Sequence, residues 1–361
     1  MSVARTADDK TGGPGAGAGQ AVRIWLLALA VAVVAMVAVG GATRLTDSGL
    51  SITEWKPVTG AIPPLSEAHW LEEFAKYQQI PEYEQINKGM SLEAFKEIYW
   101  WEWGHRFLGR LVGVLFVVPF VYFLLRGRLS PRMVWLTLGA FALGGLQGAV
   151  GWWMVTSGLS VRTDVSQYRL AAHLGVAVVI FAYLVWLSEQ AMSRPPGQAE
   201  VRRIRATGLL LPIAIFLQII LGAFVAGMDA GLAYPTWPLM DGHIVPGGIS
   251  ALTPWWLNAF ENVAAVQFNH RMVGYAVFGL VVLHALDLAC NGRGSRAQAR
   301  AHLLALIALA QVGLGISAIL YGVPLLVALA HQVVAIGLFG VAVFHADALW
   351  RDARTAALVH A

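Results

Sequence analysis

Apolar residues along this chain fall into eight long runs separated by shorter polar segments. Each run has about 18 to 23 residues, which is enough for a helix to cross roughly 30 Å of hydrocarbon. The runs cover residues 24–42, 107–125, 133–153, 170–188, 206–226, 267–289, 301–320 and 325–346. The pattern therefore predicts an all-α polytopic membrane protein with eight transmembrane helices.

One long polar segment, residues 44–103, separates the first two runs. Within it, apolar residues near 66–79 and 91–103 recur at helical spacing, which predicts two short amphipathic helices. The second of these ends in a cluster of aromatic residues, Tyr99-Trp100-Trp101-Glu102-Trp103. Because aromatic side chains prefer the membrane interface, we expect this cluster to lie flat on the membrane and to lead into the second span.

Composition supports a membrane protein and limits its metal chemistry. Hydrophobic residues make up 57% of the 361 positions and charged residues 13%, with a mean hydropathy of +0.62. Cys290 is the only cysteine, which excludes an intrachain disulfide and a thiolate-bound cluster. Any metal must therefore be bound by nitrogen or oxygen. The first twenty residues are rich in Gly and Ala and resemble neither a signal nor a transit peptide.

The distribution of charge predicts the topology. Arginines gather in the segments after the second, fourth and sixth spans and near both ends of the chain, whereas glutamates gather in residues 44–103. Since basic residues are retained on the cytoplasmic side, we expect both termini in the cytoplasm and residues 44–103 outside a bacterial cytoplasmic (inner) membrane. The basic clusters are explained as topology signals and do not indicate nucleic-acid binding.

The chain contains an internal duplication. The segment from Asp47 to Trp55 matches the segment from Asp229 to Trp237 at a constant offset of 182 residues. His105, Gln147 and His173 likewise match His270, Gln311 and His331 at offsets of 165, 164 and 158. Because each copy holds an even number of spans, both cross the membrane in the same sense. We therefore expect two four-helix bundles related by a pseudo-twofold axis.

The duplication also predicts the domain boundaries. We expect a disordered cytoplasmic tail (1–22), an N-terminal bundle (23–190) that includes the outer loop (44–103), a cytoplasmic linker (191–205), a C-terminal bundle (206–348) and a cytoplasmic tail (349–361).

Four histidines occupy equivalent positions near the outer ends of the second, fourth, sixth and eighth spans. They are His105, His173, His270 and His331. Helix bundles commonly hold cofactors between side chains of facing helices, and paired imidazoles without cysteine or carboxylate partners suit axial ligation of haem iron. One such histidine alone would be interpreted as a packing residue. Four that follow the duplication predict two bis-histidine haem sites near the outer face.

The two copies differ at one informative position. Glu102 lies three residues before His105, whereas Gln267 lies three residues before His270. A carboxylate beside a porphyrin can carry protons or stabilise positive charge, and an amide cannot ionise. We therefore expect the reactive site in the first copy and an electron-transfer haem in the second. The alternative for Glu102 is a capping or interfacial role.

Further polar residues accompany the histidines. Arg106 and Arg271 follow His105 and His270 and are candidate contacts for anionic haem propionates, with snorkelling to lipid headgroups as the alternative. Gln147, Gln218 and Gln311 each begin a Gln-x-x-x-Gly run, which is typical of close helix packing with an interhelical hydrogen bond.

A second pair of histidines lies deeper in the C-terminal half. His284 and His345 each follow a candidate ligand by fourteen residues, which rise roughly 21 Å along a helix on nearly the same face. A further haem there is an alternative to an interfacial pair without a ligand role.

With these residues assembled, the sequence resembles the haem A synthase family from about residue 24 to residue 348. The motifs that carry the resemblance are GGATRLTDSGLSI at 40–52, EWKP at 54–57, EWGHR at 102–106, LQG at 146–148, LAAHL at 170–174 and QFNHR at 267–271. The family converts haem O to haem A by oxidising a ring methyl group to a formyl group. Because cysteines are absent from the first outer loop, the chain looks like the cysteine-free class that includes mitochondrial enzymes.

The resemblance also implies residue roles and partners. His270 and His331 would hold a resident haem b, His105 and His173 would bind the substrate haem O, and Glu102 would assist turnover. Expected partners are the haem O synthase that supplies the substrate, cytochrome oxidase or its assembly factors as recipient, an unidentified electron donor, membrane lipid and a second copy of the chain. Two alternative functions are a quinol-linked dihaem electron-transfer protein and a haem carrier without porphyrin chemistry.

Overall fold

The protein is built almost entirely from long helices. The computed structural model describes residues 16–192 and 197–359. Within these ranges, eight helices are long and apolar enough to cross a membrane, which confirms the predicted number of spans. They are α1 (Ala16–Leu45), α4 (Leu92–Leu125), α5 (Pro131–Val155), α6 (Gln167–Gln190), α7 (Arg202–Gly227), α9 (Val263–Asn291), α10 (Ser295–Leu320) and α11 (Leu325–Val359).

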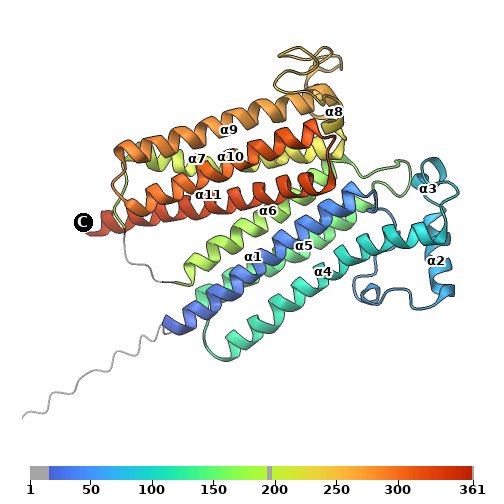
Figure 1. The fold of residues 1–361 in the computed structure, drawn as a ribbon. Helices are drawn as coiled ribbons and strands as arrows, with labels where there is room; N and C mark the ends of the chain where they lie inside the picture. The colour runs from blue at the N-terminus through green and yellow to red at the C-terminus, as the bar shows by residue number, and fades with distance from the viewer. Residues whose placement is uncertain (1–15, 193–196, 360–361) are drawn as a thin grey trace, which may run out of the picture.

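The helices of each half of the chain lie together (Figure 1), with α1, α4, α5 and α6 in one group and α7, α9, α10 and α11 in the other. In the second group each helix packs against two others, in the order α7, α9, α10, α11 and back to α7. In the first group α4 packs on α1, α1 on α6 and α6 on α5. The backbones of α4 and α5 approach less closely, and these two helices meet through side chains, Phe116 with Phe141 and Arg106 with Trp152. The first bundle is therefore packed more loosely along one side than the second. Helices α6 and α1 join the groups by packing against α7 and α11.

Short elements lie at one end of the helices, which we call the loop end (Figure 1). They are α2 (Glu67–Tyr77), α3 (Pro81–Gln85), α8 (Asn258–Glu261) and three 3-10 turns at Thr59–Ala61, Ala230–Leu232 and Trp255–Leu257. Helix α2 confirms the amphipathic helix expected near 66–79.

The aromatic segment before the second span differs from the expectation. Residues 92–103 do not form a separate helix lying flat; they are the first turns of α4, which is continuous for 34 residues. Ser91 caps its N-terminus by accepting a hydrogen bond from the Ala94 amide, and Phe95 and Tyr99 are buried against the loop helices. Because residues 92–106 contain no proline and the loop helices supply an apolar partner, α4 begins well before the apolar run.

The expected boundaries of the terminal segments are also corrected. Residues 16–22, assigned to a disordered tail, are helical and belong to α1, since alanine favours the helix and Val22 is buried in the core. The rest of that tail lies outside the described residues. At the other end, α11 continues through most of the segment 349–361, and only residues 360 and 361 lie outside the description.

The loop end has an apolar core of its own. The buried residues of this cluster are Leu50, Ile52, Phe74, Tyr77, Ile80, Phe95, Tyr99, Val155 and Val165. It fixes α2 and α3 over the ends of α4 and α5. Glu82 of α3 is buried beside Tyr77, and its Oε2 atom has no hydrogen-bond partner among the described residues. Burial raises the pKa of the Glu82 carboxyl to about 8, and the charges of Asp47, Glu102 and Asp164 act in the same direction.

This carboxyl should make the stability of the loop end depend on pH. Between a pH of about 4.5 and about 8, folded Glu82 keeps its proton while the unfolded chain loses it, so stability falls as pH rises through this window. Glu82→Gln removes the ionisation, and its melting temperature should exceed that of the wild type by an amount that grows up to pH 8 and then stays constant. Thermal unfolding in detergent between pH 5 and pH 9 measures this difference. Glu84→Gln, at an exposed position of the same helix, should follow the wild type throughout.

Candidate haem sites

The four candidate ligand histidines lie at the loop end, where their helices begin. His173, His270 and His331 are six or seven residues from the first residue of α6, α9 and α11. His105 is further along α4 because that helix extends beyond the others. All four side chains are half-buried. The structure thus places the four histidines at the same end of the two bundles.

Each imidazole ring packs against a glycine of a neighbouring helix. Methyl groups added at these glycines would lie 2.8 to 3.1 Å from the ring, too close for any other residue to fit without displacement. The pairs are Gly40 with His105, Gly151 with His173, Gly222 with His270 and Gly315 with His331. The glycines therefore make the space that the rings occupy.

At three of the four sites a glutamine precedes the glycine by four residues, on the same helix face. Its Nε2 atom donates to the backbone carbonyl oxygen of the histidine: Gln147 to His173 at 3.1 Å, Gln218 to His270 at 2.9 Å and Gln311 to His331 at 2.9 Å. The interhelical hydrogen bonds expected of these glutamines are therefore present, and each is made to a candidate ligand histidine. At the fourth site the corresponding residue before Gly40 is Met36.

The rings of His270 and His331 have the separation that a shared iron requires. Their centres are 6.5 Å apart and their planes are inclined at 75°. With about 2 Å between a metal and an imidazole nitrogen and about 1 Å from that nitrogen to the ring centre, two axial imidazoles place their centres roughly 6 Å apart. The structure also brings His105 of α4 and His173 of α6 close enough for their side chains to interact electrostatically.

Unpartnered polar atoms around the rings fit a metal-bound state. The Nδ1 atoms of His105, His173 and His331 are buried without a hydrogen-bond partner, and so are the Oε1 atoms of the three glutamines. A histidine that binds metal through one nitrogen normally donates its other N–H to an oxygen acceptor, and these glutamine oxygens are acceptors of that kind. The nitrogen-only donor set, the ring separation and the glycine spaces together fit haem.

Arg106 and Arg271 hold equivalent parts of the two loops. Arg106 donates to the carbonyl oxygens of Ile52 and Glu54 at 2.7 and 2.8 Å. Arg271 donates to those of Tyr234 and Thr236 at 2.7 and 2.9 Å. The two pairs of acceptors are again 182 residues apart. Most of the donor capacity of these arginines is therefore used by the chain itself, although Nε of Arg271 is buried without a partner.

Glu102 and Gln267 bind the same parts of the loops with opposite hydrogen-bond polarity. The Glu102 carboxylate is buried and accepts from Ser51 Oγ at 2.8 Å, the Ile52 amide at 2.6 Å and Arg106 Nη2 at 2.5 Å. Gln267 instead donates from Nε2 to the carbonyl oxygens of Gly231 and Tyr234 at 3.4 and 3.3 Å. Three donors thus fix the position of Glu102 one helical turn from His105.

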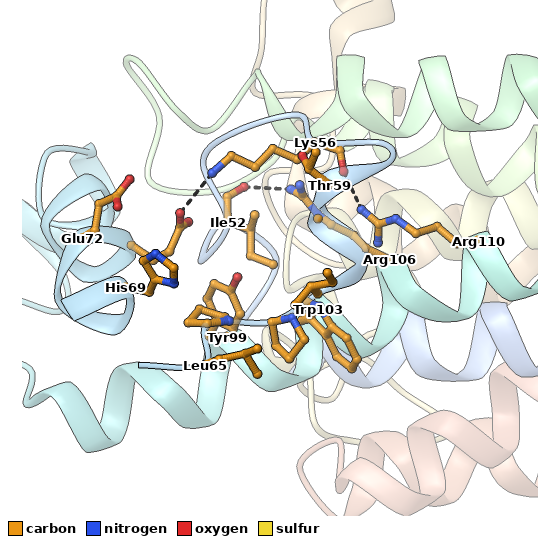
Figure 2. A pocket seen from close by; sticks show the side chains of 15 residues that line it. Ile52, Lys56, Thr59, Leu65, His69, Glu72, Tyr99, Trp103, Arg106 and Arg110 are labelled. Atoms are coloured by element: carbon orange, nitrogen blue, oxygen red, sulfur yellow. Dashed lines mark hydrogen bonds and ion pairs between the residues drawn. The ribbon is translucent and has the colours of Figure 1, made fainter. Parts of the chain in front are cut away.

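A cavity of about 410 Å³ is lined by Ile52 and Arg106, two of the residues that bind the Glu102 carboxylate (Figure 2). It is bounded by the loop after α1, by α2 and by the outer part of α4, with Tyr99, Trp103, Arg106 and Arg110 on its α4 side. Two donors of the lining, Trp103 Nε1 and Arg110 Nη1, are buried without partners. Hydrogen bonds from Lys56 and Lys76 lower the pKa of Glu54 at the edge of the same loop. The cavity therefore has a mixed lining, with apolar side chains and a few charged ones, near the candidate reactive site.

The deeper pair, His284 and His345, is arranged differently. The two rings are buried and hydrogen-bonded to each other, with 2.9 Å between their Nε2 atoms. His284 Nδ1 also contacts Thr207 Oγ1 at 2.7 Å, and Arg300 donates from Nε to His345 Nδ1 at 3.3 Å. Axial nitrogens on opposite sides of one metal are about 4 Å apart. The observed geometry is therefore a hydrogen-bonded pair and not an iron site.

Sequence reasoning did not assign a role to the glycines that face the rings. The pattern that could have identified them is the Gln-x-x-x-Gly spacing together with the offset of 182, which aligns Gly40 with Gly222 and Met36 with Gln218. Helix pairing was needed to show which histidine each glycine faces.

Comparisons with known proteins identify the family of the chain. The family model described as cytochrome oxidase assembly protein, COX15-CtaA, matches residues 23–343. A protein named Heme A synthase from Azorhizobium caulinodans is 54% identical over 316 residues, which cover 87% of this chain and 90% of the relative. Proteins of the same name from a Methylobacterium species and a Chelativorans species are 57% and 53% identical, over 87% and 89% of this chain and 88% of each relative.

The glycine spaces should be required for haem binding. In Gly315→Ala the added methyl group would lie 2.9 Å from the His331 ring and displace it. We expect the haem bound per protein to fall by at least half and the low-spin ferric EPR signal to broaden or shift. Gly313→Ala on the same helix meets nothing within 4 Å and is the matched control. Equal haem content and EPR spectra in the two variants would contradict the role assigned to the glycine.

Proposed function

We infer that this chain, which belongs to the COX15-CtaA family of cytochrome oxidase assembly proteins, is a membrane oxidoreductase that converts haem O to haem A for cytochrome oxidase. The observation that carries this conclusion is the identity of more than half of the aligned residues over nearly nine tenths of the chain to proteins of that activity. The paired histidines suit the binding of two haems, and the reaction needs two because both the substrate and the resident cofactor are iron porphyrins.

We assign the two haem groups to different bundles. His270 and His331 hold the resident haem b, because their ring separation suits one iron and the closed bundle around them suits a permanent cofactor. His105 and His173 bind haem O, because the bundle around them is packed more loosely between α4 and α5 than the other bundle, which suits a substrate that must enter and leave. The resident haem supplies an iron centre that can pass electrons to the substrate site.

Glu102 is the proposed catalytic residue of the substrate site. It is buried one turn before His105, and its equivalent in the other bundle is the amide of Gln267. Ser51, Ile52 and Arg106 hold the carboxylate in one position, so that its charge acts from a fixed place beside the porphyrin. A carboxylate there can accept a proton or stabilise positive charge at the reacting carbon.

The arginines have a primary role in holding the loops over the haem sites, through the carbonyl oxygens described above. We retain the proposal that they also contact haem propionates, which the unpartnered Nε of Arg271 supports. Both termini are proposed to lie in the cytoplasm, with the loop end and both haem sites near the outer face of a bacterial cytoplasmic membrane. Residues 23–190 and 206–348 are then the substrate and cofactor units.

The assignment is tested by supplying haem O. The chain is expressed with a haem O synthase, and the extracted pigments are separated by chromatography. We expect haem A or its hydroxylated intermediate in the wild type and at least a hundredfold less in Glu102→Gln, which removes the ionisable group at a site of acid-base chemistry. Glu93→Gln, at an exposed position of the same helix, is the control and should retain the wild-type activity.

The same experiment separates the alternatives. If Glu102 only tethers the loop, Glu102→Gln should lose bound haem O and activity together; a catalytic Glu102 predicts that haem O binding survives while conversion is lost. A dihaem electron-transfer protein or a haem carrier would return haem O unmodified from the wild type.

The division of labour between the bundles makes a further prediction. His270→Ala and His331→Ala should each lower the resident haem b content severalfold, because an iron held by two protein ligands loses one of them. His105→Ala should lower it much less. Pyridine haemochrome spectra of protein purified without haem O give the haem b content, and equal losses in all three variants would overturn the assignment.

A further inference from the structure

We propose that a chain of four polar side chains positions the two ligands of the resident haem from the opposite end of the second bundle, which we call the inner end. The chain consists of Arg300, His345, His284 and Thr207, one residue from each helix of the bundle. This inference rests on the proposed function, which assigns the resident haem to His270 and His331. It deepens that function by naming residues that hold these ligands in place without touching the haem.

The direction of every hydrogen bond in the chain is fixed. A guanidinium group only donates, so Arg300 Nε donates to His345 Nδ1 at 3.3 Å, and that ring nitrogen carries no proton. His345 then holds its proton on Nε2 and donates from there to His284 Nε2 at 2.9 Å. His284 in turn donates from Nδ1 to Thr207 Oγ1 at 2.7 Å, and the Thr207 hydroxyl donates to the Ile204 carbonyl oxygen at 3.1 Å. Both imidazoles are therefore neutral, and each has one defined tautomer.

The two inner rings differ from the candidate ligand rings in how fully they are bonded. His284 and His345 are buried, and all four of their ring nitrogens have a hydrogen-bond partner. At the loop end, three of the four candidate ligand histidines have a buried Nδ1 atom without a partner. The inner pair is therefore a complete connection between helices and not a second ligand site.

The chain can act on the haem site because it shares two helices with it. Helix α9 carries both His270 and His284, and α11 carries both His331 and His345, in each case fourteen residues apart on nearly the same face. These two helices lie across the bundle from each other, and each packs on α7 and α10. The bond between the inner rings fixes the separation of α9 and α11 at that end. Because helices are stiff elements, it also constrains the separation of the two ligands at the loop end.

The first bundle lacks this connection at the equivalent positions. The repeat offsets of 182, 165, 164 and 158 align Thr207, His284, Arg300 and His345 with Trp25, Pro119, Leu136 and Leu187. Proline and leucine have no polar side-chain atoms, which excludes a side-chain hydrogen bond between α4 and α6 at this position. Trp25 of α1 donates instead to the Leu115 carbonyl oxygen of α4 at 2.9 Å, and Tyr183 of α6 donates to that of Leu136 of α5 at 3.0 Å. These bonds join neighbouring helices and leave the two ligand-bearing helices unconnected, which suits a haem that is exchanged.

Retention of the resident haem measures the effect of the chain. The full-length protein is purified in detergent with its haem b and without haem O, and the transfer of haem to excess apomyoglobin is followed by absorbance. His345→Leu, with the residue type of the first bundle, should lose haem b at least about fivefold faster than the wild type, the factor that one net hydrogen bond of about 1 kcal/mol gives. Its low-spin ferric EPR signal should shift, since that signal responds to the arrangement of the axial imidazoles. His302→Leu replaces an exposed histidine of α10 and should match the wild type.

A double variant separates positioning from general destabilisation. His345→Leu alone leaves His284 buried without its partner, which lowers the melting temperature whatever the role of the pair. Combining His284→Leu with His345→Leu removes both polar rings, so the melting temperature should return toward the wild-type value. Haem loss should stay fast and the EPR signal shifted, because α9 and α11 are still not bonded to each other.

Thr207 gives a milder test that keeps both rings. Thr207→Ser retains the hydroxyl and should lose haem b at the wild-type rate. Thr207→Val removes the acceptor for His284 Nδ1 and should lose it faster. These two variants and the double variant decide the question even where a single histidine variant does not fold.

Either of two results overturns the proposal: the double variant keeps haem b at the wild-type rate with an unshifted EPR signal, or Thr207→Val and Thr207→Ser lose haem b at the same rate. A purely local packing role would give the first result, because it lowers the melting temperature without changing the haem site. The proposed function fails in a different way, when the wild type forms no haem A from haem O. Haem b retention is measured without haem O and does not depend on that conversion.

Discussion

Placing imidazole rings inside a membrane helix bundle is the requirement on which the rest of this structure depends. A polar ring in an apolar interior is costly unless it is held and paired, and hydrocarbon offers no water to do either. The chain meets this requirement from the neighbouring helix, with a glycine that makes room for the ring and, at three sites, a glutamine that bonds to the histidine. Glycine and glutamine four residues apart share one helix face, so a single short motif supplies both.

The loops repeat a second arrangement, with a difference that bears on the chemistry. Arg106 and Arg271 hold equivalent carbonyl oxygens and keep the two loops in the same position over their bundles. Within that shared frame, Glu102 accepts hydrogen bonds from the loop whereas Gln267 donates to it. The loop backbone near Ile52 presents an N–H to the carboxylate, and the equivalent region near Tyr234 presents a carbonyl oxygen to the amide. The backbone of each loop thus matches the side chain that it faces, an N–H for the carboxylate and a carbonyl oxygen for the amide.

The two bundles differ in closure as well as in charge. The second is a ring of four mutually packed helices around the pair His270 and His331, an arrangement suited to a cofactor that stays bound. The first is packed more loosely between α4 and α5 and has Met36 where the other three sites have a glutamine. Both differences fall in the same bundle as Glu102, which suits the proposed binding and release of a large planar substrate on this side.

The sequence alone determined the eight spans, the duplication, the four histidines and the difference between Glu102 and Gln267, because hydrophobic run length and the repeat offset depend only on the order of residues. It could not show that α4 is continuous through the aromatic segment, that residues 16–22 are helical, or that the arginines bind loop carbonyls, since each depends on what packs nearby. The deeper histidines illustrate the limit best. Spacing places His284 and His345 as it places the candidate ligand pairs, and only the tertiary structure, by bringing their nitrogens to 2.9 Å, decided that they bind each other.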